Sequence, residues 1–175
     1  MWTTIVIIVV IAIAGILILA ATKPSIFRVE RAARIAAPPE KIFPLIDDFR
    51  NWTQWSPWEE RDPALKRTYS GAAKGVGTVY AWEGNRKVGA GRMEITESVP
   101  VSKIVLKHDF LKPMKAHHTT EFVLQPDGNA TNVTWSMYGP AAFMTKIMQV
   151  FMDMDRMVGK DFDTGLANMK AAAEK

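Results

Sequence analysis

The chain has 175 residues, a length that favours one domain with a short appendage. Almost half of the residues are apolar (48%), enough for a sizeable core, and the absence of cysteine excludes disulfides, a thiolate nucleophile and a cysteine-based metal site. The net charge of +4 comes from scattered basic residues without a dense stripe or a nucleic-acid motif, so we expect no nucleic-acid partner.

The first segment, Trp2 to Thr22, contains no charged residue. As a helix it would span roughly 31 Å, about one hydrocarbon core, and Trp2 stands where an interfacial aromatic anchor would lie. A cleaved signal peptide is the alternative, disfavoured because no Lys or Arg precedes the run and because the run is longer than the apolar region of a usual signal. We therefore predict a transmembrane anchor over residues 1–22 and a single-pass membrane protein.

Basic residues follow this segment and none precedes it: Lys23, Arg28, Arg31 and Arg34. The positive-inside tendency then predicts that the remainder of the chain lies in the cytoplasm. Residues 23–26 form a short linker, and we expect one folded domain over residues 27–175.

That domain begins with a strand candidate from Phe27 to Ala36, and Pro38-Pro39-Glu40 then opens a helix, since proline is tolerated in a first helical turn. Beyond Asp62-Pro63 the apolar pattern takes period two, with turn residues between the segments. The strand candidates are Leu65 to Ser70, Gly77 to Trp82, Gly91 to Val99, Lys103 to Phe110, Met114 to Leu124 and Thr131 to Tyr138.

From Ala141 onward apolar residues recur at intervals of three and four, which predicts a helix of about thirty residues along one face of the sheet. The order of strand, helices, successive hairpin strands and one long helix is typical of an α+β fold.

This order, with several short stretches, resembles the START-like (SRPBCC) superfamily, especially its polyketide cyclase/dehydrase branch. The matching stretches are residues 29–31, 36–43, 48–52, 55–58, 75–77, 80–84, 159–162 and 165–170. The resemblance implies a helix-grip fold, in which a curved antiparallel sheet surrounds the long C-terminal helix and often leaves a deep, mainly apolar cavity. Relatives bind lipids, sterols or polyketides, and some catalyse cyclisation or dehydration. No catalytic set is common to the superfamily, so the resemblance assigns no catalytic residue.

Strand alternation predicts which side chains face the long helix. If Val133, Trp135 and Met137 point inward, the neighbouring strands point inward with residues 118, 120, 122 and 124, and with residues 104, 106, 108 and 110. His117 then points to the other face. Replacing the inward Trp135 by Ala is expected to lower stability modestly and to change the binding of an apolar probe.

These patterns give a set of candidate ligand-binding residues, which are Trp55, Trp58, Trp82, Leu106, His108, His118, Phe122, Trp135 and Met148. The two histidines could orient a ligand or exchange protons with it; histidines at the sheet edge, with one nitrogen in solvent, are the favoured alternative. For the tryptophans around residue 55 and the methionines of the last helix, fold-defining packing is favoured over ligand contact.

We expect no metal and no cofactor, because the chain has three histidines without ligand-like spacing and lacks phosphate-binding and dinucleotide-binding fingerprints. The sequence favours a membrane-tethered binding module for a hydrophobic small molecule, lipid-like or polyketide-like. One alternative is a cyclase or dehydratase that uses His108 or His118 with water or with a tyrosine such as Tyr138. The other is an accessory protein whose pocket is filled by its own side chains.

Overall fold

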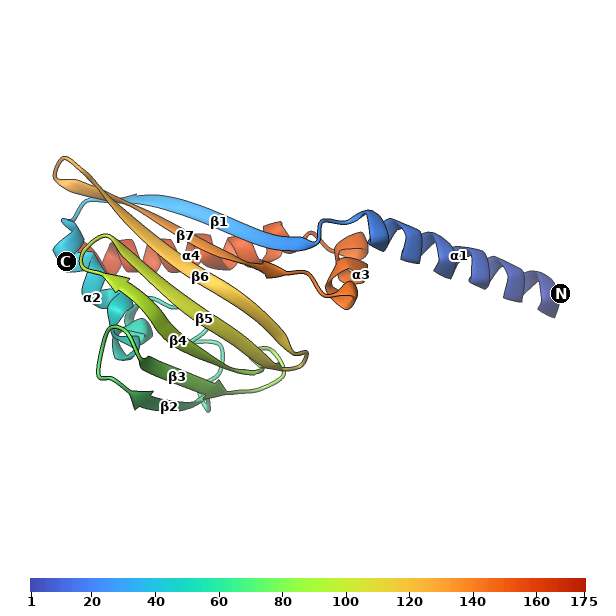
Figure 1. Ribbon diagram of the computed structural model, residues 1–175, viewed down its shortest axis with the longest axis horizontal. Helices are drawn as coiled ribbons and strands as arrows, with labels where there is room; N and C mark the ends of the chain where they lie inside the picture. The colour runs from blue at the N-terminus through green and yellow to red at the C-terminus, as the bar shows by residue number, and fades with distance from the viewer.

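The computed structural model describes all 175 residues. It contains a seven-stranded antiparallel sheet in the order β1-β7-β6-β5-β4-β3-β2, which curves around the C-terminal helix (Figure 1). The elements are α1 (Trp2–Thr22), β1 (Ile26–Ile35), α2 (Pro39–Asp47), the 3-10 helix η1 (Phe49–Gln54), β2 (Lys66–Gly71), β3 (Thr78–Glu83), β4 (Ala90–Val99), β5 (Lys103–Lys112), β6 (Ala116–Asp127), β7 (Ala130–Pro140), α3 (Phe143–Phe151) and α4 (Met154–Ala173). This arrangement is the predicted helix-grip fold.

The strand register confirms the predicted inward face. Phe122 pairs with Trp135 and Leu124 with Val133, and all four side chains are buried. His117 lies on the opposite, exposed face, where its Nδ1 is 2.7 Å from Asp109 Oδ1. Because side chains alternate strictly along a strand, one correct face assignment carries along the whole strand.

Helix α4 lies along the concave face and contacts β1. Two glycines of α4 allow the close approach: a Cβ at Gly165 would stand 2.7 Å from Cζ3 of Trp135, and one at Gly159 would collide with the guanidinium of Arg31. Arg31 also holds α4 to β1 through an ion pair with Asp155, 3.0 Å long. The helix is therefore held against the sheet by both shape and charge.

The predicted single C-terminal helix is wrong in one respect, because two helices occupy the segment. Met152 is extended (φ −133°, ψ 134°), and the carboxylate of Asp153 accepts a hydrogen bond of 2.9 Å from the backbone N–H of Arg156, which caps α4. An aspartate at an N-cap satisfies a free backbone donor, so the chain starts a new helix here. Helix α3 consequently leaves the concave face and contacts α1.

Helix α1 extends away from the domain (Figure 1), and Ala20 is its one fully buried residue. Its length and composition would allow it to cross a membrane, although a signal sequence has the same properties. The strand that follows α1 starts at the same end of the sheet as the β5–β6 and β3–β4 loops. The register shows this, because Ile26 pairs with Pro140, Ala116 with Phe110 and Ala90 with Lys112.

Candidate functional site

The concave face is divided into a filled half and a hollow half. The filled half lies nearer α2, where Phe122, Trp135 and Phe162 form a continuous stack: the ring centroids are 5.0 Å apart in the first pair and 4.0 Å in the second. Trp55 meets Trp135 edge-on at 5.4 Å, and its indole N–H donates to the carbonyl of Leu45 at 2.7 Å. Aromatic packing of this kind leaves no space for a ligand.

The hollow half lies toward the end of the sheet from which α1 leaves. Here the side chains enclose a cavity of about 250 Å³, and 13 of its 18 lining residues are hydrophobic. The lining comprises Trp52, Ser56, Trp58, Glu59 and Leu65, then Tyr80, Trp82, Val88, Met93, His108, Phe110, Thr120, Trp135 and Met137 from the sheet and its loops, and Met157, Val158, Asp161 and Phe162 from α4. The volume lies just below the usual range of small-molecule pockets, about 300–1,000 Å³.

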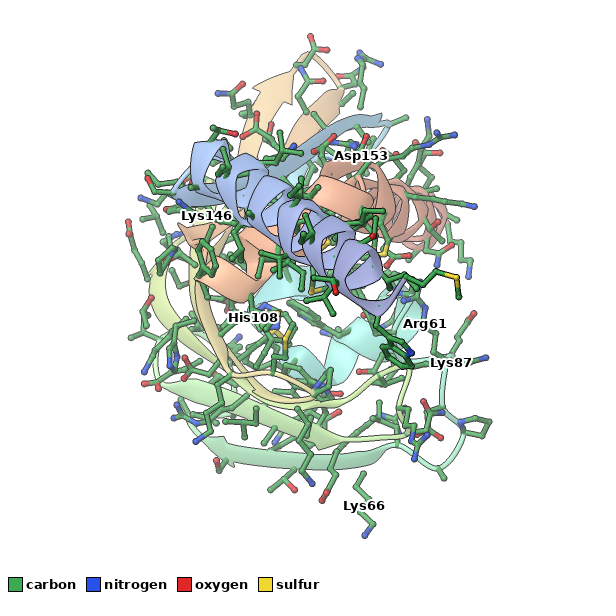
Figure 2. All side chains as sticks on the ribbon, turned by 90° about the vertical axis from the view of Figure 1, so that its right-hand side faces the viewer. Arg61, Lys66, Lys87, His108, Lys146 and Asp153 are labelled. Atoms are coloured by element: carbon green, nitrogen blue, oxygen red, sulfur yellow. The ribbon has the colours of Figure 1, made fainter.

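One wall of this cavity is aromatic. Trp82 lies over Gly91 of the paired strand, where a Cβ would approach the indole to 2.3 Å. Its ring meets His108 edge-on at 5.5 Å, and the imidazole stacks on Phe110 at 4.3 Å. Viewed from the α1 end, His108 lies inside the curve of the sheet and below the helices (Figure 2).

His108 is a neutral polar group in an apolar wall. Burial lowers its pKa to about 3, with a further contribution from the neighbouring His118, so the imidazole carries no charge at neutral pH. Its Nδ1 is 3.2 Å from the hydroxyl oxygen of Thr120, whereas Nε2 is buried without a hydrogen-bond partner. The indole Nε1 of Trp135 is likewise buried and unpartnered. Each such group costs about 1–3 kcal/mol, which a ligand atom or water reaching it would recover.

A second polar cluster on the cavity wall is satisfied within the protein. The carboxylate of the buried Glu59 accepts hydrogen bonds from the Tyr80 hydroxyl at 2.6 Å and from Nε of Arg67 at 2.5 Å. Burial and the bond to Glu59 raise the pKa of Tyr80, so the phenol keeps its proton. Both carboxylate oxygens are engaged, and the cluster fixes the loop before β2 against β3 instead of offering a free acid or base.

One side of the cavity is bordered by a contact between a loop and α4. Arg61 forms an ion pair with Asp161, and its guanidinium lies 5.8 Å from the ring centroid of Trp58. Trp58 in turn meets Phe162 edge-on at 6.3 Å. The loop after η1 is thereby fastened to the first half of α4.

Comparison with known proteins settles the family. Residues 27–174 match the family described as polyketide cyclase/dehydrase and lipid transport. The chain belongs to this family. The resemblance seen in the sequence is thus confirmed, and no curated protein sequence matches the chain.

Solved structures show the same fold as this polyketide cyclase/dehydrase family member. Protein CV1439 from Chromobacterium violaceum is 16% identical, with a TM-score of 0.60, and the match covers 87% of this chain and 99% of that one. The ginseng (Panax ginseng) major latex-like protein 151 is 12% identical, with a TM-score of 0.60 and coverage of 85% and 97%. The di-domain ARO/CYC protein BexL of the BE-7585A biosynthetic pathway is 16% identical, with a TM-score of 0.61, and matches 90% of this chain over 53% of its own length.

Four of the nine residues proposed from the sequence line the cavity of this family member: Trp58, Trp82, His108 and Trp135. The other five do not. Leu106 and Phe122 are fully buried in the filled half, and Trp55 packs under α2. His118 borders Phe27 and Phe110, at ring distances of 5.2 Å and 5.8 Å, and Met148 lies on α3. Tyr138 is on the outer face, where Arg28 stacks on its ring at 5.3 Å, so it cannot assist either histidine.

Sequence reasoning missed several lining residues. Tyr80 and Met93 alternate inward on β3 and β4, and period two would have identified them from Trp82 once the pairing of these strands was known. Met157, Val158 and Asp161 belong to the first turns of α4, whose start was hidden by the assumption of one continuous helix. For Trp52 the sequence favours packing over ligand contact. Trp52 does pack, donating to the carbonyl of Ile46 at 3.0 Å, and it also lines the cavity.

Proposed function

We propose that the protein binds a small, mainly apolar molecule in the cavity between the sheet and α4, and that α1 holds it at a membrane. The observation that carries this proposal is a predominantly hydrophobic cavity whose wall includes two residues with buried, unpartnered polar atoms, His108 and Trp135. The indole N–H is a donor, so a carbonyl or hydroxyl oxygen on the ligand suits it.

The cavity volume of about 250 Å³ sets the size of the ligand. It suits a molecule somewhat smaller than a typical drug, such as one or two fused rings or a short acyl chain, because drug-sized ligands occupy larger pockets. Binding would be driven by removal of apolar area from water, about 25 cal/mol per Å². The wider family is described as including lipid transport, which agrees with an apolar ligand.

The geometry favours binding over catalysis. An efficient general base has a pKa near the working pH, and burial holds that of His108 at about 3. No carboxylate contacts its ring nitrogens. Glu59, a carboxylate in the cavity wall, already accepts hydrogen bonds from Tyr80 and Arg67. A cyclase or dehydratase remains the alternative function. In such an enzyme, binding of the substrate would have to raise the pKa of His108 toward the working pH.

A pair of α4 variants tests the proposal. Val158→Trp places a large ring at a half-buried position that lines the cavity, whereas Lys160→Trp places the same ring on the exposed side of the same helix. Native mass spectrometry of the full-length protein, followed by organic extraction, should find a copurifying apolar compound in the wild type and in Lys160→Trp. The compound should be lost in Val158→Trp. Equal occupancy in all three proteins would place the compound elsewhere.

A further inference from the structure

Helix α3 is an apolar helix whose neighbour is α1. In contact with α1 it is displaced from the concave face, and three of its large side chains stay more than half exposed: Phe143 at 51%, Met144 at 55% and Phe151 at 65%. Soluble domains seldom leave a contiguous group of large apolar side chains in water without a partner for it. The exposed side of α3 therefore requires a covering surface.

The hairpin of β5 and β6 also exposes large apolar side chains, at the end of the sheet from which α1 leaves. Leu111 is 51% exposed and Met114 is 42% exposed, and Lys112 and Lys115 stand beside them. Figure 1 shows this hairpin and α3 at the end of the domain from which α1 leaves. This end of the domain thus presents apolar side chains from two segments that lie far apart in the sequence.

The charges of these two segments have one sign. Neither α3 nor residues 111–115 contain an acidic residue, and Lys146 and Lys115 are basic. Lys112 is also basic, but it forms an ion pair of 3.0 Å with Glu83. Figure 2 shows Lys146 at this end of the molecule. Large apolar side chains interspersed with lysines suit the boundary between anionic lipid headgroups and acyl chains, where each basic residue adds to the attraction.

The position of α3 along α1 matches the depth of that boundary. Ala20, in the last turn of α1, is the helix's one fully buried residue, and α3 contacts α1. If α1 spans a bilayer, its last turns lie near the bilayer surface, and interfacial helices bury their apolar face about 5–10 Å into that region.

We propose that the exposed side of α3 and the tip of the β5–β6 hairpin form a membrane-docking face that lies in the headgroup region of an anionic bilayer. This face consists of Phe143, Met144, Phe151, Leu111 and Met114. The inference rests on the proposed membrane attachment through α1. It adds that the cavity end of the domain is held against the bilayer, so that an apolar ligand can pass between lipid and cavity without crossing open water.

The natural absence of cysteine allows a direct test with single spin labels on the full-length chain. Cysteine is introduced at Phe151 or Met114 on the docking face, at Val10 in α1 as a reporter of the anchor, and at Val99 as a matched control. Val99 is also an exposed apolar residue (43%), but it is the last residue of β4, at the opposite end of the sheet. The protein is reconstituted in vesicles of equal parts phosphatidylcholine and phosphatidylglycerol, and the accessibility of each label to oxygen and to a water-soluble nickel complex is measured.

The labels at Phe151 and Met114 should favour oxygen over nickel, as the label at Val10 does, while the label at Val99 should stay fully accessible to nickel. Replacing Lys115 and Lys146 by Glu should return the label at Phe151 toward aqueous values. If Val10 lies in the bilayer but Phe151 and Met114 are as accessible as Val99, the docking face is wrong and the anchor stands. If the label at Val10 is itself aqueous, the anchor is wrong and the docking face falls with it. Spin–spin broadening at Phe151 would assign the surface to a second copy of the chain and overturn the proposal.

Discussion

The indole of Trp135 and the phenyl ring of Phe162 lie parallel, with their centroids 4.0 Å apart and an interplanar angle of 6°. This contact joins β7 to α4 at the boundary between the filled and the hollow halves of the concave face. Trp135 is therefore both a core residue, 2% exposed, and a part of the cavity wall.

The stack makes Trp135 more important for stability than its place on a strand suggests. We expect Trp135→Ala to lower the free energy of unfolding by about 3–5 kcal/mol, because the ring is enclosed by Phe122, Phe162 and Trp55. This loss exceeds the modest one that alternation alone predicted. Trp135→Phe keeps much of the stack and removes the unpartnered N–H, so it should cost far less; chemical denaturation measures both. Equal losses for the two variants would show that the stack contributes little.

Gly165 tests how tightly α4 approaches the sheet. A Cβ there would lie 2.7 Å from Cζ3 of Trp135 and 3.2 Å from Cδ of Pro57. Gly165→Ala should lower the unfolding free energy by roughly 1–3 kcal/mol, because overpacking outweighs the gain in helix propensity. Ala167→Val, on the exposed side of the same helix, adds volume without a neighbour and should change stability by less than about 0.5 kcal/mol. A stabilised Gly165→Ala protein would mean that the helix stands farther from Trp135.

The cap of α4 can be tested separately. Removing the carboxylate in Asp153→Ala should cost about 1 kcal/mol, because the N–H of Arg156 loses its acceptor. Asp153→Asn retains an acceptor and should stay close to the wild type in thermal unfolding. If Asp153→Ala were as stable as the wild type, the break between α3 and α4 would have another cause.

The buried His108 predicts a pH dependence. Its pKa lies at about 3 in the folded protein and near 6.5 when the chain is unfolded, so between these values the unfolded state binds more protons. The contribution of the neutral, buried imidazole to stability is fully present above about pH 6.5. It is lost as the pH falls toward 3, because protonation of His108 then favours the unfolded state. The free energy of unfolding should therefore decrease below pH 6.5, with a slope of up to about 1.4 kcal/mol per pH unit from this residue.

Denaturant titrations at pH 7 and pH 5 measure that slope. His108→Gln should flatten it, and part should remain because burial also lowers the pKa of His118. A His108→Gln protein with an unchanged pH dependence would show that the imidazole is hydrated in solution.

The sequence identified the fold and the inward face of the sheet, because period two and turn chemistry repeat over many residues. It could not distinguish Phe122 from His108, which share that face although one lies in packed core and the other at the cavity. The difference arises from what stands opposite: Trp52 and Trp55 pack edge-on against Phe122, whereas His108 faces the cavity. Strand periodicity carries no information about that opposing layer.

The break at Asp153 was hidden for a related reason. Met148, Phe151, Met154 and Val158 keep the spacing of one helical face across the junction, and the methionine at position 152 is not a helix-breaking residue type. The available signal was Asp153 itself, a residue type favoured at N-caps, followed by an acidic residue in the first turn. The prediction of one continuous helix placed Met148 on the cavity wall.

The most direct test of ligand binding uses the methionines as internal reporters. Met93, Met137 and Met157 line the cavity, whereas Met169 is fully buried elsewhere and Met148 lies on α3. The full-length protein, labelled with ¹³C at its methionine methyl groups, is titrated in detergent micelles with 2-acetylnaphthalene, a small apolar ketone that can accept a hydrogen bond. The account predicts that the methyl signals of Met93, Met137 and Met157 shift together and saturate at one ligand per chain, while those of Met169 and Met148 stay in place. Shifts confined to the α3 methionines, or none at all, would contradict a ligand site between the sheet and α4.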